Sequence, residues 1–216
     1  MPLILRVDAH DPDAAVVRQA ADLIRDGLVV AYPTDTLYGL AVDPRNDAAV
    51  RRLFALKGRP ESSALTLIAA DLAQAREAAE VTAAAERLAA EWWPGPLTIV
   101  MRARPGLAAG TLAGGTTVGV RVPGHAVAVA LARESGFCVT ATSANRSGEA
   151  AASSPEALTA ALPDVDAILD AGPAPGGAPS TLVEVSARGA TLLRAGVVPW
   201  ERVLRSLAQD GNERTK

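Results

Sequence analysis

The chain has 216 residues, of which 49% are apolar and only 3% aromatic, and its formal net charge at pH 7 is −3. This length favours one domain with a substantial core of Ala, Val, Leu and Ile, and the charge gives no sign of a surface that binds nucleic acid generally. The single cysteine excludes a disulfide framework, the N-terminus becomes charged too early for a signal peptide, and no apolar run reaches the about eighteen residues of a membrane span. We therefore expect a cytoplasmic protein with no membrane partner.

Helices and strands are predicted in alternation from the N-terminus. Asp11 is the expected N-cap of a first helix that Gly27 ends. Residues 28–32 form a short, buried strand. Asn46 caps a second helix, which ends at Gly58 in the position that favours glycine.

The rest of the chain continues this mixture. Further strands are expected at residues 64–69, 97–101, 117–122, 137–142, 180–185 and 191–194. Further helices are expected in the Ala-rich stretch that ends at residues 92–93, over 124–133, from 154 onward and over 199–208. With no internal repeat and no long linker, this argues for a single α/β domain over residues 1–208. We expect residues 170–179, rich in Gly, Pro and Ala, to be mobile, and the polar tail 209–216 to be disordered.

Polar clusters follow several predicted strands, at residues 33–38, 57–63, 142–148 and 180–181. Ligand crevices of α/β folds form at strand ends. The chain has no Walker A sequence, no dinucleotide-binding glycine fingerprint and no CxxC or HExxH metal signature. His10 and His125 are too isolated for a catalytic triad, and His125 is expected to be a capping or surface residue. Asp35 is expected in an Asx-type turn.

Lys57 is one of two lysines in a chain with nineteen arginines. Its compact ammonium beside Arg59 suits a polyanion such as a triphosphate, but a cation is also favoured at any helix C-terminus, and the sequence does not separate these readings. The other candidates are cations and hydroxyl or amide donors: Arg59, Arg121, Arg194, Ser143, Asn145, Thr34 and Thr36. Without an acid/base pair, this set fits either transfer at phosphorus, which rests on positioning and charge neutralisation, or anion binding without chemistry.

Seven collinear segments between residues 12 and 205 resemble the YrdC-type threonylcarbamoyl-AMP synthases, in their short, single-domain form. The segments are Tyr32-Pro-Thr-Asp-Thr-Leu-Tyr-Gly-Leu40, Lys57-Gly-Arg-Pro60, Trp93-Pro-Gly-Pro-Leu-Thr98, Val118-Gly-Val-Arg-Val-Pro123, Thr142-Ser-Ala-Asn-Arg-Ser-Gly148, Pro179-Ser-Thr-Leu-Val183 and Leu193-Arg-Ala-Gly196. Seven motifs in one order are a highly specific match.

The resemblance implies a twisted, open mixed sheet with a concave, positively charged cavity for ATP and L-threonine. It implies a nucleotidyltransferase that joins L-threonine, bicarbonate and ATP into L-threonylcarbamoyladenylate and releases pyrophosphate. The product would feed the machinery that makes threonylcarbamoyladenosine at position 37 of tRNA. Mg²⁺ is the implied cofactor, and weak RNA binding is a further expectation.

The resemblance also implies roles for single residues. Lys57, Arg59, Ser143 and Asn145 would surround the nucleotide phosphates as the catalytic set. Contacts to ATP would come from these four and from Ser63, Thr117, Ala151 and Arg194. L-threonine would lie against Thr34, Thr36, Ile68, Arg121, Ala141 and Ser180, with Arg121 on its carboxylate. No protein metal signature is present, so Mg²⁺ would arrive on the ATP phosphates, near Ser143 and Asn145.

Two departures from the family pattern keep an alternative open. Ser63-Ala64-Leu65 stands where the family usually carries Lys or Asn before Pro-Leu, and His125-Ala126 stands where it carries His-Pro. Ser63 retains one hydrogen-bond donor but lacks the charge or amide. The alternative is a paralogue that binds RNA or nucleotide in the same cavity without making the adenylate.

Overall fold

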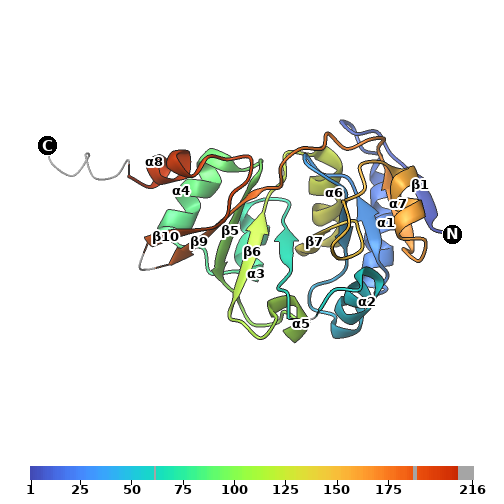
Figure 1. Ribbon diagram of the computed structural model, residues 1–216, viewed down its shortest axis with the longest axis horizontal. Helices are drawn as coiled ribbons and strands as arrows, with labels where there is room; N and C mark the ends of the chain where they lie inside the picture. Colours follow the sequence, from blue (N-terminus) through green and yellow to red (C-terminus); the bar gives the residue numbers. More distant parts are fainter. Residues whose placement is uncertain (61, 187–188, 209–216) are drawn as a thin grey trace, which may run out of the picture.

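A ten-stranded open sheet runs through the computed structural model, which describes residues 1–60, 62–186 and 189–208. Both parallel and antiparallel pairs occur in it. The predicted α/β fold with an open mixed sheet is therefore confirmed (Figure 1). In spatial order the strands are β1 (Leu3–Arg6), β8 (Ala167–Asp170), β2 (Val30–Tyr32), β3 (Gly39–Ala41), β7 (Val139–Ser143), β4 (Thr66–Ile68), β6 (Thr117–Arg121), β5 (Leu97–Arg102), β9 (Thr181–Ser186) and β10 (Gly189–Arg194).

Strand β7 joins the two halves of this sheet. It pairs antiparallel with β3 through Gly39 and Ser143, and antiparallel with β4 through Thr66 and Ala141. A strand was predicted here, at residues 137–142. Strands β1, β3 and β8 were not predicted; β3 follows directly on the polar loop 33–38 and is only three residues long.

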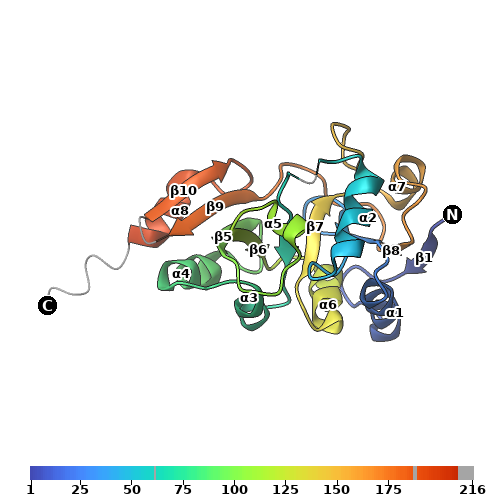
Figure 2. The ribbon, with the colours of Figure 1, turned by 90° about the horizontal axis from the view of Figure 1, so that it is seen from below.

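The helices lie on both sides of the sheet. Figure 2 shows α1, α6, α3 and α4 along one side, and α2 and α7 on the other, toward the end that carries β1. The middle strands of the second face are thus left to line a cavity. The helices are α1 (Ala14–Arg25), α2 (Asp47–Lys57), α3 (Leu72–Ala78), α4 (Ala83–Trp92), α5 (Ala109–Leu112), α6 (Ala126–Ser135), α7 (Pro155–Ala161) and α8 (Trp200–Ala208). Helix α8 packs on α4. None of them within the described ranges has the length and apolar character of a transmembrane helix.

Helix ends follow the capping residues, with one correction. Asn46 caps α2 by accepting hydrogen bonds from two backbone N–H groups, and Gly58 ends it at φ +58°, both as predicted. Helix α1, however, is capped by Asp13 and not by Asp11. The carboxylate of Asp8 accepts the backbone N–H of Asp11 at 2.9 Å, so Asp11 belongs to the preceding turn.

The core is built from small and branched aliphatic side chains, as the composition predicts. Ala20, Ala21, Ala128 and Ala132 are fully buried in one cluster, and α1 packs against α6. Small side chains let these two helices approach closely, so they pack densely where they meet. The predicted tail 209–216 lies outside the described residues.

Gly196 packs directly on the backbone that begins β9. A Cβ built at Gly196 would lie 2.3 Å from the carbonyl oxygen of Pro179 and 2.5 Å from the backbone nitrogen of Thr181. The same crossing is held by the Thr181 hydroxyl, which donates to the carbonyl of Val198 at 2.7 Å. Only glycine fits this contact, because backbone atoms cannot move aside as a flexible side chain can.

We expect Gly196→Ala to lower the free energy of unfolding by about 3 kcal/mol, at the upper end of the range for overpacking. The measurement is chemical denaturation of the variant beside Ala195→Ser, which adds an oxygen atom at the exposed neighbouring position. Equal stability of the two variants would contradict the packing seen here.

Candidate functional site

A cavity of about 490 Å³ lies where β7 meets β3 and β4, within the size range of small-molecule sites. Residues far apart in sequence meet in it, from the loop 34–39, strands β4 and β7, and the segment 179–182. The predicted site residues that line it are Thr34, Thr36, Arg59, Ile68, Arg121, Ala141, Ser143, Asn145, Ala151, Ser180 and Arg194. Lys57, Ser63 and Thr117 are not among its lining residues. The ligand contacts assigned to all of these residues stay predictions.

Among the described residues, the charged side chains that line the cavity are those of three arginines and of Glu149. Burial lowers the pKa of Arg59 and of Arg194, and the charge of Arg121 lowers that of Arg194 further. These shifts mean that the cavity disfavours the positive charges it contains. An anionic ligand would relieve this cost, so the cavity is suited to phosphates and carboxylates.

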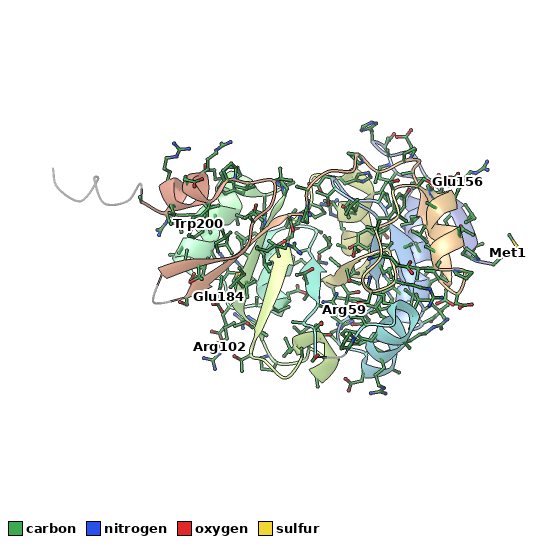
Figure 3. All side chains as sticks on the ribbon, in the orientation of Figure 1. Met1, Arg59, Arg102, Glu156, Glu184 and Trp200 are labelled. Carbon is green, nitrogen blue, oxygen red and sulfur yellow. The ribbon has the colours of Figure 1, made fainter. Side chains whose placement is uncertain are left out.

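Arg59 reaches the cavity because Gly58 turns the chain at the end of α2. The left-handed conformation of Gly58 lets the backbone N–H of Arg59 bond back to the carbonyl of Phe54 at 3.0 Å. The guanidinium then donates to the Thr142 hydroxyl at 2.9 Å and to the Ala64 carbonyl at 3.1 Å. Figure 3 labels Arg59 near the middle of the molecule. Both of these partners are neutral, so among the described residues no carboxylate pairs with Arg59 and its charge is open to a ligand.

Lys57 lies behind the loop that follows β7. Its Nζ donates to the carbonyl oxygens of Ser143 and Asn145 and to Oδ1 of Asn145, the last two at 2.8 and 3.2 Å. Its own carbonyl accepts the backbone N–H of Ser147 at 2.8 Å. Burial lowers the pKa of Lys57 to about 8, and the charge of Arg59 adds to this shift. The lysine therefore holds the Ser143–Asn145 loop in place, a contact that neither sequence interpretation of Lys57 included.

The side-chain amide of Asn145 uses its hydrogen-bonding atoms in contacts with Lys57 and with its own loop. Its Oδ1 accepts from Lys57 and from the Ser143 hydroxyl, and its Nδ2 donates to the carbonyls of Arg146 and Glu149 at 2.9 and 2.6 Å. Both lone pairs of Oδ1 are thus used. In the described part of the chain, no group of three or more His, Cys, Asp or Glu residues could hold a metal ion. These contacts fit a metal carried by a phosphate ligand better than one bound first by Asn145.

The two threonines of the loop 34–39 differ in how free their hydroxyls are. The hydroxyl of Thr34 accepts from the backbone N–H groups of Thr36 and Leu37, at 3.1 and 3.2 Å, and donates to the Leu37 carbonyl at 2.7 Å. Its one donor and two acceptor positions are therefore filled. The hydroxyl of Thr36 lies 3.1 Å from that of Thr34, which has no position left to offer. Thr36 is thus the better placed of the two to bind a ligand.

Ser180 links Arg194 to the floor of the cavity. Arg194 donates to the carbonyl of Ser180 at 3.0 Å and to its hydroxyl at 3.2 Å. The same hydroxyl lies 2.8 Å from that of Thr98 on β5. Gly196, two residues after Arg194, packs on the backbone of residues 179–181, so the chain after β10 lies against the segment that contains Ser180.

Arg121 is the last residue of β6, and its guanidinium is paired with the carboxylate of Asp35, for which the sequence predicted a different role. Its Nε donates to the carbonyl of Gly95 at 2.8 Å, and its Nη2 donates to Oδ1 of Asp35. The prediction of an Asx-type turn at Asp35 was wrong, because its carboxylate pairs with Arg121 across the fold. His125 occupies the N-cap position of α6, but its side chain makes no capping hydrogen bond. Burial lowers the pKa of His125.

The sequence analysis missed several residues that line the cavity. Thr66 and Leu67 belong to β4, whose residue Ile68 was predicted. Tyr32 is fully buried, donates its hydroxyl to the Thr140 carbonyl at 3.1 Å, and packs its ring over Gly39. These residues line the cavity because of their neighbours across the sheet. Those neighbours are set by strand register, which is a property of the tertiary structure and could not be predicted from the sequence. The missed lining residues are Tyr32, Leu37, Tyr38, Gly39, Ala64, Thr66, Leu67, Thr98, Thr142, Glu149, Pro179 and Leu182.

The segment 171–179 crosses the edge of the loop 34–39. The hydroxyl of Tyr38 donates to the Gly172 carbonyl at 2.7 Å, and the backbone N–H of Gly176 donates to the Thr36 carbonyl at 2.8 Å. The expected mobility of this segment stays a prediction. These two contacts tie it to the part of the loop that carries Thr36.

With only two lysines in the chain, the ionisation of Lys57 can be measured directly. We expect one lysine Cε resonance to titrate with a pKa of about 8, because burial disfavours the charged ammonium. The measurement is a carbon-13 NMR titration of protein labelled at lysine, with the signal assigned by its loss in Lys57→Arg. Titration of that signal above pH 10 would contradict the burial described here.

Comparison with known proteins places this site in a family. A family model, Sua5_yciO_yrdC, described as "Telomere recombination", matches residues 22–196. The threonylcarbamoyl-AMP synthase of Bacillus subtilis is 36% identical over 200 residues, which cover 91% of this chain and 57% of that protein. The threonylcarbamoyl-AMP synthase of Methylococcus capsulatus is 42% identical over 150 residues, or 68% of this chain and 80% of that protein.

Solved structures agree with these sequences. Sua5 of Pyrococcus abyssi in complex with L-threonine matches with a TM-score of 0.89 at 33% identity, over 95% of this chain and 61% of that one. YciO of E. coli matches with a TM-score of 0.83 at 25% identity, over 92% of this chain and 98% of that one. The chain thus spans less than two thirds of the Bacillus and Pyrococcus proteins. Because the family model matches most of the chain and the fold agrees throughout, this protein belongs to the Sua5/YciO/YrdC family.

Proposed function

We propose that this protein is a threonylcarbamoyl-AMP synthase, which forms L-threonylcarbamoyladenylate and pyrophosphate from L-threonine, bicarbonate and ATP. The observation that carries the proposal is the cavity in which Arg59, Arg121 and Arg194 meet the hydroxyls of Thr36, Ser143 and Ser180. The fold of the chain matches that of a relative whose structure was solved with L-threonine. The Bacillus and Methylococcus relatives described above are named threonylcarbamoyl-AMP synthase. Substrates with one carboxylate and three phosphates fit the need of this cavity for negative charge.

The two substrates would divide the cavity between them. Arg121 would bind the carboxylate of L-threonine, with Thr36, Ala141 and Ser180 around the amino acid and Ile68 near its methyl group. Arg59 and Arg194 would bind the phosphates of ATP, with Ser143 and Ala151 beside them. Lys57 would act through the loop it holds, since its Nζ is already bound to three oxygen atoms. Thr117 and Ser63 lie outside the cavity lining, so we assign no contact to them.

The proposed chemistry has two bond-forming steps. The free amine of L-threonine attacks the carbon of CO₂ derived from bicarbonate and loses a proton, which gives a carbamate. A carbamate oxygen then attacks the α-phosphorus of ATP, and pyrophosphate leaves with the electron pair of the broken P–O bond. The arginines would stabilise the charge that develops on the phosphates, which is the main contribution of a protein to such transfers.

Mg²⁺ is the expected cofactor and would enter on the ATP phosphates. The described residues fit this route, because Ser143 lines the cavity while Oδ1 of Asn145 is already occupied. The ion would neutralise phosphate charge and orient the leaving pyrophosphate. In the cytoplasm, the product would pass to the machinery that modifies position 37 of tRNA. Weak RNA binding by this protein would accompany that transfer.

The test of this function is pyrophosphate release from the purified protein. We expect pyrophosphate only when ATP, L-threonine and bicarbonate are all present, because the carbamate is the nucleophile. Arg59→Ala should lower turnover by about two orders of magnitude, the scale of other electrostatic stabilisers. Arg52→Ala is the control, because Arg52 lies on helix α2, which precedes Arg59, and is paired with Asp166 outside the cavity. ATP hydrolysis without L-threonine, or RNA binding with no adenylate formed, would favour the paralogue without synthase activity.

A second test separates the two substrates. Arg121→Ala should raise the KM for L-threonine by about tenfold or more and leave the KM for ATP nearly unchanged, because one charge-assisted pair is lost. Arg194→Ala should do the reverse. Steady-state kinetics with each substrate varied in turn gives both constants. Equal effects on both substrates from both variants would contradict this division of the cavity.

A further inference from the structure

We infer that Asp35 is a positioning residue, which holds the guanidinium of Arg121 so that its remaining donors face the carboxylate of the amino-acid substrate. This inference rests on the proposed function and adds a residue to it. Asp35 does not line the cavity, whereas Arg121 does. Asp35 therefore acts on the substrate only through the arginine.

The guanidinium of Arg121 is anchored at two points. Its Nε donates to the Gly95 carbonyl at 2.8 Å, and its Nη2 is paired with Oδ1 of Asp35. The first anchor is itself fixed, because the backbone N–H of Gly95 donates to the Val122 carbonyl at 2.8 Å. Two anchors on a planar group determine both its position and its rotation.

The anchors also decide which donors remain. Within the described part of the chain, no hydrogen bond uses Nη1 of Arg121, and Nη2 has a second hydrogen. A substrate carboxylate would therefore bind at the terminal nitrogens and not at the edge that contains Nε. Such a geometry requires the guanidinium to be held in one orientation, which the contacts with Gly95 and Asp35 provide.

The pair is enclosed, which makes it stronger than a surface ion pair. The side chain of Arg121 is 8% exposed and that of Asp35 is 18% exposed. In such surroundings a guanidinium left without its carboxylate is costly and seeks another partner. Without Asp35, we expect the arginine to leave the orientation that suits the substrate.

Gly124 provides a second observation on the same carboxylate. A Cβ built at Gly124 would lie 3.3 Å from Oδ2 of Asp35, which is closer than most such contacts. Glycine at this position leaves room for the carboxylate beside the start of α6. Gly124→Ala thus displaces Asp35 by a few tenths of an ångström without removing its charge.

The experiment measures the binding of L-threonine and of L-threoninamide, which lacks the carboxylate, to the full chain by calorimetry. The variants are Asp35→Asn, which keeps the shape but removes the charge, and Gly124→Ala. Asp43→Asn is the matched control, since Asp43 pairs with Arg45 through two hydrogen bonds and does not line the cavity. ATP binding is measured for each variant.

We expect Asp35→Asn to weaken L-threonine binding about tenfold or more and to change L-threoninamide and ATP binding by less than about twofold. Gly124→Ala should weaken L-threonine binding in the same selective way, but by a smaller factor. Asp43→Asn should bind all ligands as the parent protein does. Unchanged L-threonine binding, or equal weakening of L-threonine and L-threoninamide, in a folded Asp35→Asn protein would overturn the inference. If that variant does not fold, the same two readings are taken on Gly124→Ala. A parent protein that binds no L-threonine would overturn the proposed function itself.

Discussion

The antiparallel pairing of β7 with both β3 and β4 is the constraint on which the site depends. The pairing joins the two halves of the sheet and brings the loop after Ser143 to the side of the cavity. The cavity residues on β3, β4 and β7 then lie at neighbouring positions, fixed by backbone hydrogen bonds. Arg59, which follows α2, and Arg121 on β6 depend on the same register, because Thr142 on β7 accepts from Arg59 and Ile68 on β4 lies opposite Arg121.

The site holds its cations mostly with neutral acceptors. Lys57 binds backbone and amide oxygens, Arg59 binds a hydroxyl and a carbonyl, and Arg194 binds Ser180. Within the described ranges no carboxylate pairs with these three cations, and burial lowers the pKa of each. A cavity of this kind is suited to anions, because the negative charge of a bound phosphate would stabilise these partly buried cations. Arg121 is different, because Asp35 already balances it.

The difference between these arginines is consistent with two kinds of ligand. A triphosphate carries several charges and gains most from cations without partners. A single carboxylate on a small amino acid needs an arginine in one orientation, and a held guanidinium provides it. Arg121 and Arg194 line the same cavity, and the charge of Arg121 lowers the pKa of Arg194.

Much of the local structure could be predicted because its causes are local. The Asn46 cap and the Gly58 turn each act within a few residues of the chain. The cap of α1 was misplaced because Asp11 and Asp13 both flank Pro12, and only the contact of Asp8 with the N–H of Asp11 decides between them. The short strands β1, β3 and β8 were missed because three or four residues carry too little periodicity, and their partners lie far along the chain.

The sequence by itself determined the fold class and the candidate residues, since these depend on pattern and on motifs that keep their order. Only the tertiary structure decided what those residues touch. It placed Lys57 behind a loop, Asp35 against Arg121, and Gly196 on the backbone of residues 179–181. The physical reason is the same in each case. The first two contacts join residues 88 and 86 positions apart and the third joins residues about 15 apart. Their geometry is set by strand register and burial, which no local pattern encodes.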